Sequence, residues 1–334
     1  MGCTSCRVDD LKFEIKIEGE TNLHILPNVI EHLGRREITV KVENNILIIK
    51  ESGVKEFLDF CIDHMNFENV SFRLPDQEWR AIREVEQILE VQWIDEIIEK
   101  ELITCFFQPI VNVKKEIYAY EILSRFKKED GSTMYPNEVF SAAKSRGRLY
   151  ALDRICRMTA VRNAVLLKNV KTFINFIPTS IYSPEFCLRS TTKLANELGV
   201  DSSQLVFEVV ETEKVDDIDH LKKILAYYKD KGFQYALDDV GEGYNTIELL
   251  ADIKPNYMKL DMKFVQGVAD DVSKQETAKK LIDMALEIGS VPLAEGVETQ
   301  EDFDWMKECG YELFQGYFFG KPAPSPIERV EQTQ

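Results

Sequence analysis

The sequence offers little of what disulfide-bonded, zinc-binding or membrane-spanning proteins need. It has only four histidines and seven scattered cysteines among its 334 residues. With an odd number of cysteines and no secretory signal, we expect reduced thiols, no disulfide framework and a cytoplasmic location. The longest apolar stretches fall far short of the roughly 20 residues of a membrane-spanning helix, so we expect no membrane partner.

Positive charge is scarce as well. Lysine and arginine number 41 against 58 aspartates and glutamates, which gives a net charge of -17. Polymeric nucleic acid and anionic membranes both bind broad basic surfaces, so this balance argues against both classes of partner. If the ligand is an anion, bound cations must mediate. The hydrophobic content of 44% predicts a folded protein, and the length suits one large and one small domain.

The opening segment MGCTSC contains the pair Cys3 and Cys6. Besides a frayed tail, this segment allows two functional interpretations, namely acylation at Gly2 and Cys3 or metal binding by the cysteine pair. Position 6 is Cys where a myristoylation signal has Ser or Thr, and no second cysteine pair or histidine partner follows at zinc spacing. We therefore expect a frayed tail, and the role of the two cysteines stays open.

Three parts follow one another along the chain. Residues 1–75 mix strand patterns such as LKFEIKI with the amphipathic segment VKEFLDFCIDHM, which predicts a small α+β regulatory domain. Residues 76–101 contain no Gly or Pro and repeat apolar residues near helical spacing, which predicts a linker helix. Residues 102–330 form the third part, in which short apolar runs alternate with amphipathic segments. The sequence of the first part leaves open what it recognises.

Residues 102–330 alternate short apolar runs with amphipathic segments. The eight runs are CFFQPIV, EIYAYEIL, KTFINFI, QLVFEVVE, FQYALDD, NYMKLD, VPLAEGVE and ELFQGYFF. Eight strands interleaved with helices predict an α/β fold, a (β/α)₈ TIM-like barrel. The first two runs are joined by only NVKKE, which is too short for a helical crossover. We therefore expect an antiparallel first strand in this barrel.

Seven of the eight runs end with an oxygen-bearing or cationic side chain. These side chains are Glu121, Asn175, Glu208, Asp238 with Asp239, Lys259 with Asp261, Glu295 with Glu298, and Gln315. A helix cap or a surface ion pair explains any one of them. Because barrel active sites lie at the carboxyl ends of the strands, their repetition at the same end predicts one common site.

Oxygen ligands without imidazole or thiolate suit Mg²⁺ or Mn²⁺, and all four histidines lie outside the run ends. Several carboxylates around one mouth can hold two such ions for phosphoester cleavage. In YALDDVGEGYN, Asp238 and Asp239 can both reach one site only if the second lies beyond the strand, in a turn that Gly241 and Gly243 permit. A dinucleotide-binding glycine motif fails here because Thr246 holds the third glycine position.

Residues from about 100 to 328 closely resemble the EAL family of cyclic di-GMP phosphodiesterases. Seven segments carry the resemblance in order, namely YEILSR, FINFIP, FEVVETE, ALDDVGEGYN, MKLD, AEGVET and QGYFFGKP. The first of them has Ile122 where the family has the Ala of its name. The resemblance implies a hydrolase that opens one phosphodiester of cyclic di-GMP, giving linear pGpG, with two Mg²⁺ or Mn²⁺ ions as cofactors.

The resemblance also implies a role for each matched residue. The first ion would be bound by Glu121, Asn175, Glu208 and Asp238, and the second by Asp238 and Asp239. The catalytic set would be Lys259 positioning or deprotonating the water, Glu295 assisting at the metals and Glu211 anchoring the loop after the paired aspartates. The substrate set would be Arg125 meeting a phosphate, Glu298 lining the mouth and Gln315 holding a metal-linked water.

Some positions depart from the family. Ile177 stands where Ser is common, Val240 where Phe is usual and Glu242 where the loop usually carries Thr. That loop couples dimerisation to metal binding in the family, and the resemblance implies a homodimer through the barrel. Whether the changes at Val240 and Glu242 weaken or retune activity stays open. A catalytically inactive cyclic di-GMP receptor is the alternative function. The retention of Lys259 together with every metal ligand favours the enzyme.

Overall fold

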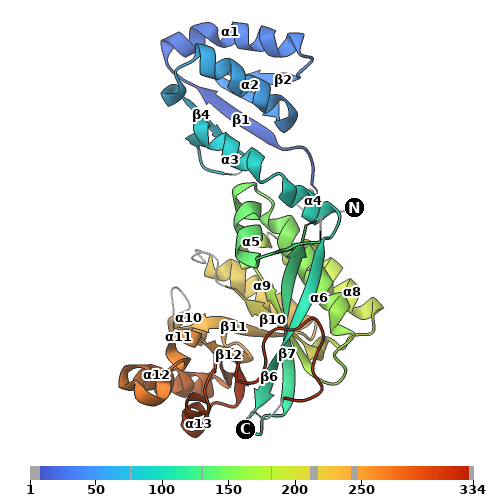
Figure 1. Cartoon of the computed structure of the whole chain (residues 1–334), viewed down its shortest axis with the longest axis vertical. Helices are drawn as coiled ribbons and strands as arrows, with labels where there is room; N and C mark the ends of the chain where they lie inside the picture. The colour runs from blue at the N-terminus through green and yellow to red at the C-terminus, as the bar shows by residue number, and fades with distance from the viewer. Residues whose placement is uncertain are drawn as a thin grey trace.

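The computed structural model describes residues 8–75, 77–128, 131–181, 183–210, 217–241 and 247–330. These residues form two β-sheets with separate hydrophobic cores. The small N-terminal unit lies at one end of the long axis and the barrel at the other (Figure 1). No helix within the described ranges is long and apolar enough to cross a membrane.

The N-terminal unit is an antiparallel sheet with strand order β2-β3-β1-β4-β5. Its strands are β1 (Lys12–Ile17), β2 (Val40–Glu43), β3 (Ile46–Lys50), β4 (Val70–Arg73) and β5 (Arg80–Ala81). In β1 the buried residues Phe13, Ile15 and Ile17 alternate with more exposed charged ones. This alternation leaves one apolar face to be covered.

Helices α1 (Glu20–Arg35) and α2 (Glu51–His64) supply the cover. Val29 from α1 and Phe57 from α2 are fully buried in the same core as the apolar face of β1. The short turn η2 (Phe67–Asn69) precedes β4. The order strand, helix, strand, strand, helix, strand is that of a ferredoxin-like unit, so the small α+β domain predicted from the sequence is present.

The segment expected as one linker helix over residues 76–101 is divided in the structure. It contains β5, the turn η3 (Ile82–Glu84), and two short helices, α3 (Val85–Glu90) and α4 (Trp93–Glu99). The apolar side chains of α3 pack into the N-terminal core, whereas those of α4 pack with the barrel helices α5 and α6. Because the two sets face different cores, the chain turns between the helices instead of continuing straight.

Eight strands close the barrel in the order β6-β14-β13-β12-β11-β10-β9-β7, and β6 pairs with β7. They are β6 (Ile103–Asn112), β7 (Ile117–Lys127), β9 (Lys171–Phe176), β10 (Leu205–Val209), β11 (Gln234–Val240), β12 (Tyr257–Leu260), β13 (Val291–Ala294) and β14 (Leu313–Gln315). Strand β8 (Thr133–Met134) extends the sheet beside β7. β6 is antiparallel to both of its neighbours, which confirms the predicted irregular barrel.

Helices surround the barrel. They are α5 (Pro136–Ser145), α6 (Leu149–Ala164), α7 (Pro184–Cys187), α8 (Arg189–Glu197), α9 (Ile218–Asp230), α10 (Ile247–Ile253), α11 (Met262–Val265), α12 (Val272–Ile288) and α13 (Gln300–Cys309). Short 3-10 helices lie in the connections, namely η4 (Pro178–Ser180), η5 (Ser202–Gln204) and η6 (Val268–Asp270). The largest core lies between these helices and the strands and includes stacked Phe207 and Tyr228, with ring centroids 4.1 Å apart.

Candidate active site

One apolar side chain from each barrel strand points into the barrel, and together they fill the interior below the carboxyl ends of the parallel strands. These residues are Ile110, Ala119, Phe173, Val206, Ala236, Tyr257, Leu293 and Leu313, which form one buried cluster. Side chains two positions apart along a strand point to the same face. The residue two positions further toward the barrel mouth on each strand therefore also points inward, directly above this layer.

The predicted site residues occupy these positions. Two residues beyond the apolar layer stand Glu121, Asn175, Glu208, Asp238, Lys259, Glu295 and Gln315, one from each parallel strand or its end. β6 runs in the opposite direction, so its member is Gln108, which pairs in register with Glu121. Gln108 was not among the residues predicted from the sequence, although it lies two residues before Ile110 on the antiparallel strand.

Lys259 lies at the centre of the layer and is 1% exposed. Its Nζ is 2.8 Å from Asp238 Oδ1, 2.9 Å from Glu208 Oε1 and 3.3 Å from Glu295 Oε2. A fourth carboxylate, Glu121, is 3.7 Å away. One ammonium therefore faces four carboxylates in a space with little water, which leaves an excess of negative charge.

Two of the three amides of the layer, Asn175 and Gln315, bind Glu121 from both sides. Asn175 Nδ2 donates to Glu121 Oε1 over 2.7 Å, and Gln315 Nε2 donates to Glu121 Oε2 over 2.6 Å. The side-chain oxygen Oε1 of Gln315 is buried and has no hydrogen-bond partner among the described residues. A buried acceptor of this kind usually has a partner, and a metal-linked water would supply one.

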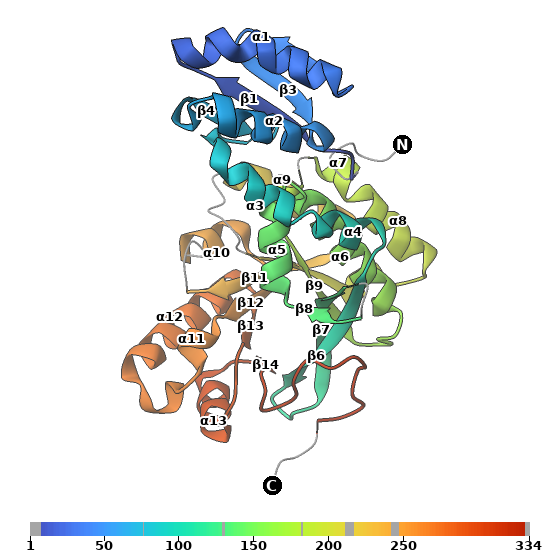
Figure 2. The same cartoon turned by 45° about the horizontal axis from the view of Figure 1, so that its top comes forward.

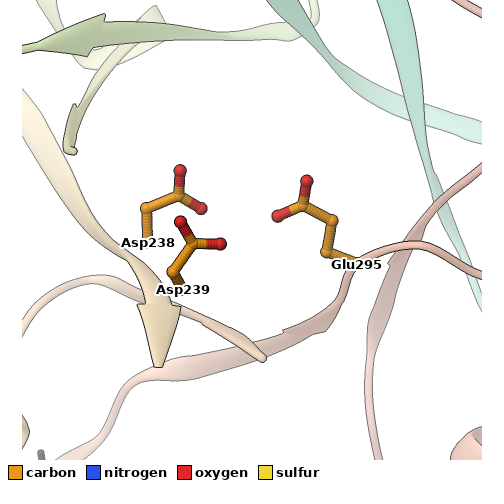
Figure 3. Close-up of side chains that lie close together, drawn as sticks. All are labelled: Asp238, Asp239 and Glu295. Atoms are coloured by element: carbon orange, nitrogen blue, oxygen red, sulfur yellow. The ribbon is translucent and has the colours of Figure 1, made fainter. Parts of the chain in front are cut away.

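Asp238, Asp239 and Glu295 can place one carboxylate oxygen each within 4.8 Å of one another. Figure 3 shows their carboxylates directed toward one another, two from the end of β11 and one from the loop after β13. Hard divalent cations prefer such oxygen donors. The donor set thus fits Mg²⁺ or Mn²⁺, and it contains neither imidazole nor thiolate.

A β-bulge explains how two neighbouring aspartates face one site. The pairing of β11 with β12 shifts register between Leu237 and Val240, and Asp239 adopts a left-handed backbone with φ 50°. We expected Asp239 to lie beyond the strand, but β11 continues to Val240, so the bulge and not the following turn redirects the side chain. Aspartate tolerates this conformation better than most residues.

Of the loop residues named from the sequence, the structure describes Gly241. Gly241 has φ 103°, and a Cβ there would lie 2.8 Å from the ring of Phe264, so only glycine fits. Gly243, Thr246 and Glu242 lie outside the described residues. Glu211 also lies outside them, and its role stays a prediction.

Burial and mutual repulsion raise the pKa values of three site carboxyls. Burial, followed by the charge of Asp238, raises the pKa of Asp239 to about 7. Burial raises the pKa of Glu295 to about 8 and that of Glu208 well above its usual value. Burial alone would lower the pKa of Lys259, but the surrounding carboxylates raise it, so Lys259 carries its proton. Without cations the site must hold protons to reduce its negative charge.

We expect the metal-free chain to lose stability as pH rises from about 5 to about 8. Asp239 and Glu295 have pKa values of about 7 and about 8 in the folded chain, above those of free carboxyls, so folding favours their protonated forms. Mn²⁺ should abolish this loss because it stabilises the deprotonated carboxylates. Thermal midpoints measured in EDTA and in Mn²⁺ across this range test both statements. A midpoint in EDTA that rises with pH would contradict them.

Two of the three residues assigned to the substrate set, Arg125 and Glu298, lie outside the inner layer. Arg125 is on β7, four residues beyond Glu121, half-buried, with its guanidinium carbon 5.1 Å from the ring centre of Phe106. Glu298 is exposed and accepts a hydrogen bond of 3.1 Å from Gln266. Asp261, which was named together with Lys259 at the end of its run, is buried. Its side chain accepts a hydrogen bond of 2.6 Å from Lys263 N and so caps α11.

Gly316 holds Gln315 in place through close backbone packing. A Cβ at Gly316 would lie 2.0 Å from Val297 O and 2.3 Å from Val297 N. We expect Gly316→Ala to lower the free energy of unfolding by about 3 kcal/mol, because backbone atoms must move apart. Gly34→Ala is the control, since nothing lies within 4 Å of its Cβ position in α1. Urea denaturation compares the two; equal midpoints would refute the packing argument.

Sequence comparison places this site in a known family. The fold and site define a TIM-like barrel with a carboxylate-rich mouth suited to divalent cations, and residues 91–322 match the EAL domain model. The chain belongs to the EAL domain family. Its relatives include the "Probable cyclic di-GMP phosphodiesterase PdeG" of Escherichia coli K12, 31% identical over 227 residues that cover 65% of this chain and 44% of that protein.

Solved structures share the fold. The c-di-GMP bound form of a standalone versatile EAL protein from Vibrio cholerae O395 is 37% identical, with a TM-score of 0.62 over 69% of this chain and 95% of that one. A manganese and cy-diGMP complex of Klebsiella pneumoniae BlrP1 is 20% identical, with a TM-score of 0.59 over 94% of this chain and 96% of that one. The chain spans less than half the length of the first curated relatives it matches.

Proposed function

We propose that the chain hydrolyses cyclic di-GMP to linear pGpG with two Mg²⁺ or Mn²⁺ ions. The observation that carries this proposal is the excess of carboxylate around Lys259 in the barrel mouth. A dianionic substrate can approach such a site only after divalent cations reverse the local charge. Family membership and the names of the relatives supply the substrate class.

The ligands divide into two groups that share one aspartate. Glu121, Asn175, Glu208 and Asp238 suit the first ion, and Asp238 with Asp239 the second, with Glu295 beside them. The bound ions would polarise a phosphoryl oxygen and activate a water molecule. The rigid strands fix these side chains in advance, which reduces the reorganisation needed on binding.

The remaining residues position the reactants. Lys259 keeps its proton among carboxylates, so we assign it to orienting the water and stabilising negative charge rather than removing a proton. Gln315 has a free amide oxygen for a metal-linked water. Arg125 presents a half-buried guanidinium to a phosphate, and exposed Glu298 lines the mouth. Glu211 anchors the loop after the paired aspartates in this proposal.

A binding protein that senses cyclic di-GMP without cleaving it is the second candidate. Lys259 and the complete ligand set favour hydrolysis, because binding alone needs neither. We also propose that two copies of the chain pair through their barrels and that the N-terminal unit modulates the rate. The pairing can be measured by sedimentation of the full chain.

Incubation of the purified chain with cyclic di-GMP and Mn²⁺ or Mg²⁺ tests the proposal. We expect linear pGpG to accumulate, and EDTA to stop its formation. Chromatography separates substrate and product, and equilibrium dialysis measures binding in parallel. Cyclic di-GMP that binds and remains intact would support the receptor and contradict the enzyme.

A further inference from the structure

The N-terminal unit meets the barrel at the turn between α5 and α6. Arg146 ends α5, is fully buried, and binds the carboxylate of Glu51, the first residue of α2, through Nη1 at 2.8 Å and Nη2 at 2.7 Å. The same guanidinium donates to Asp95 of α4 over 2.5 and 3.0 Å and to Ile88 O over 3.1 Å. Figure 2 shows α3 and α4 between the small sheet and α5.

The contact is geometrically complete. The five N–H groups of Arg146 all point to acceptors from α2, α3 and α4. Arg148 adds a bond of 2.8 Å to the other oxygen of Asp95 and one to Asp9 O. Gly147 between them has φ 69°, which lets both arginines face the N-terminal unit. Breaking a buried ion pair by removing one partner is costly, so the N-terminal unit is held firmly.

Helix α6 begins directly after this contact and carries Asp153 five residues further on. Asp153 is 3% exposed and accepts from Ile177 N over 2.9 Å and from Ser180 Oγ over 2.7 Å. Arg157, one turn further along α6, also donates to Asp153. The helical rise from Arg148 to Asp153 is only about 7.5 Å, so both contacts lie on one short rigid segment.

The segment held by Asp153 follows a metal-site residue. Asn175 on β9 donates to Glu121 in the site, and Ile177 is two residues later. Asp153 on α6 accepts hydrogen bonds from Ile177 N and from Ser180 of η4, and so fixes this segment to α6. A shift of α6 would therefore move the end of β9 and the amide of Asn175.

We propose that α6 couples the N-terminal unit to the metal site, with Arg146 as the docking residue and Asp153 as a positioning residue for Asn175. The inference rests on the proposed function, since it names how that site is regulated. Contacts at Glu51 set the position of α6, and Asp153 transmits that position to the end of β9. Residues that orient metal ligands in this way commonly change metal affinity when they are lost.

Hydrogen exchange of the metal-free full chain tests the link. The readout is the exchange rate of the peptide covering residues 171–181 relative to that of β12, so that global unfolding cancels. We expect Asp153→Asn to raise this ratio about tenfold, because a buried charged hydrogen-bond acceptor is lost. Glu51→Gln should raise the same ratio about threefold, although Glu51 belongs to the N-terminal unit and not to the barrel. The double variant should exchange no faster than Asp153→Asn alone, because that substitution has already removed the contact between α6 and the end of β9.

Two controls match these variants. Asp302→Asn removes a comparably buried carboxylate that accepts from Gly267 N and Ala269 N, and Glu14→Gln removes an ion pair with Arg73 inside the small sheet. Neither should change the ratio. The inference is overturned if Glu51→Gln leaves the ratio at the wild-type value or if the two effects multiply. The readout needs no substrate, so an inactive chain with the expected exchange would contradict the proposed function alone.

Discussion

Asp238→Asn should lower the rate of cyclic di-GMP hydrolysis by at least about a thousandfold. Asp238 is the residue that both proposed ions share, and its carboxylate lies 2.8 Å from Lys259 Nζ. Metal ions supply several kcal/mol of charge stabilisation in phosphoester cleavage, and about 4 kcal/mol corresponds to a thousandfold change in rate. An amide keeps the shape of the side chain but cannot bridge two cations as a carboxylate does.

The matched control is Asp252→Asn. Asp252 is an exposed residue of α10 that pairs with Lys222 over 2.7 Å, so the same change removes a surface ion pair of little energetic weight. Steady-state hydrolysis in saturating Mn²⁺ compares the two variants with the wild type. Activity within tenfold of the wild type for Asp238→Asn would contradict the shared-ligand role.

Lys259→Gln should lower hydrolysis by about a hundredfold to a thousandfold while Mn²⁺ binding persists. Lys259 supplies a buried positive charge beside the carboxylates that would hold the ions, and burial strengthens its electrostatic interactions. Its removal also leaves Glu208 and Asp238 without their ammonium partner. Without Lys259 the site is more negative, so it should bind cations at least as tightly as before. The variant should therefore lose activity but keep metal binding.

Lys222→Gln provides the control for this charge, since Lys222 is 42% exposed and forms an ion pair only on the surface. Calorimetric titration with Mn²⁺ measures binding, and product formation measures turnover. If Lys259→Gln retained full turnover, the lysine would serve only as a structural counter-ion. If it lost Mn²⁺ binding and turnover together, its separate role in the reaction would be refuted.

The barrel and the common site were predicted from the alternation of apolar and amphipathic segments and from the residues at the run ends. Eight apolar runs separated by amphipathic segments predict the strands, and a short link between the first two predicts the antiparallel pair that β6 and β7 form. The run-end residues Asn175 and Lys259 stand two positions beyond Phe173 and Tyr257 of the apolar layer, so they point into the barrel as well. These features were predictable because they depend on local patterning alone.

Other features depend on contacts between distant residues. Asp239 lies on a bulge within β11 and not beyond the strand as expected, because pairing with β12 shifts register there. The segment over residues 76–101 has helical spacing, but its apolar residues serve two cores. Arg146 looks like an ordinary residue of a helix end, and only the meeting of α2, α4 and α5 buries it. No local pattern encodes these arrangements.

The central claim is that side chains from separate strands hold hard divalent cations in the barrel mouth. Anomalous diffraction from crystals soaked in Mn²⁺ tests it most directly. The account predicts two peaks bridged by Asp238, one also contacting Glu208 and the other Asp239. Well-ordered crystals with no anomalous peak among these carboxylates, at Mn²⁺ concentrations that saturate activity, would contradict it.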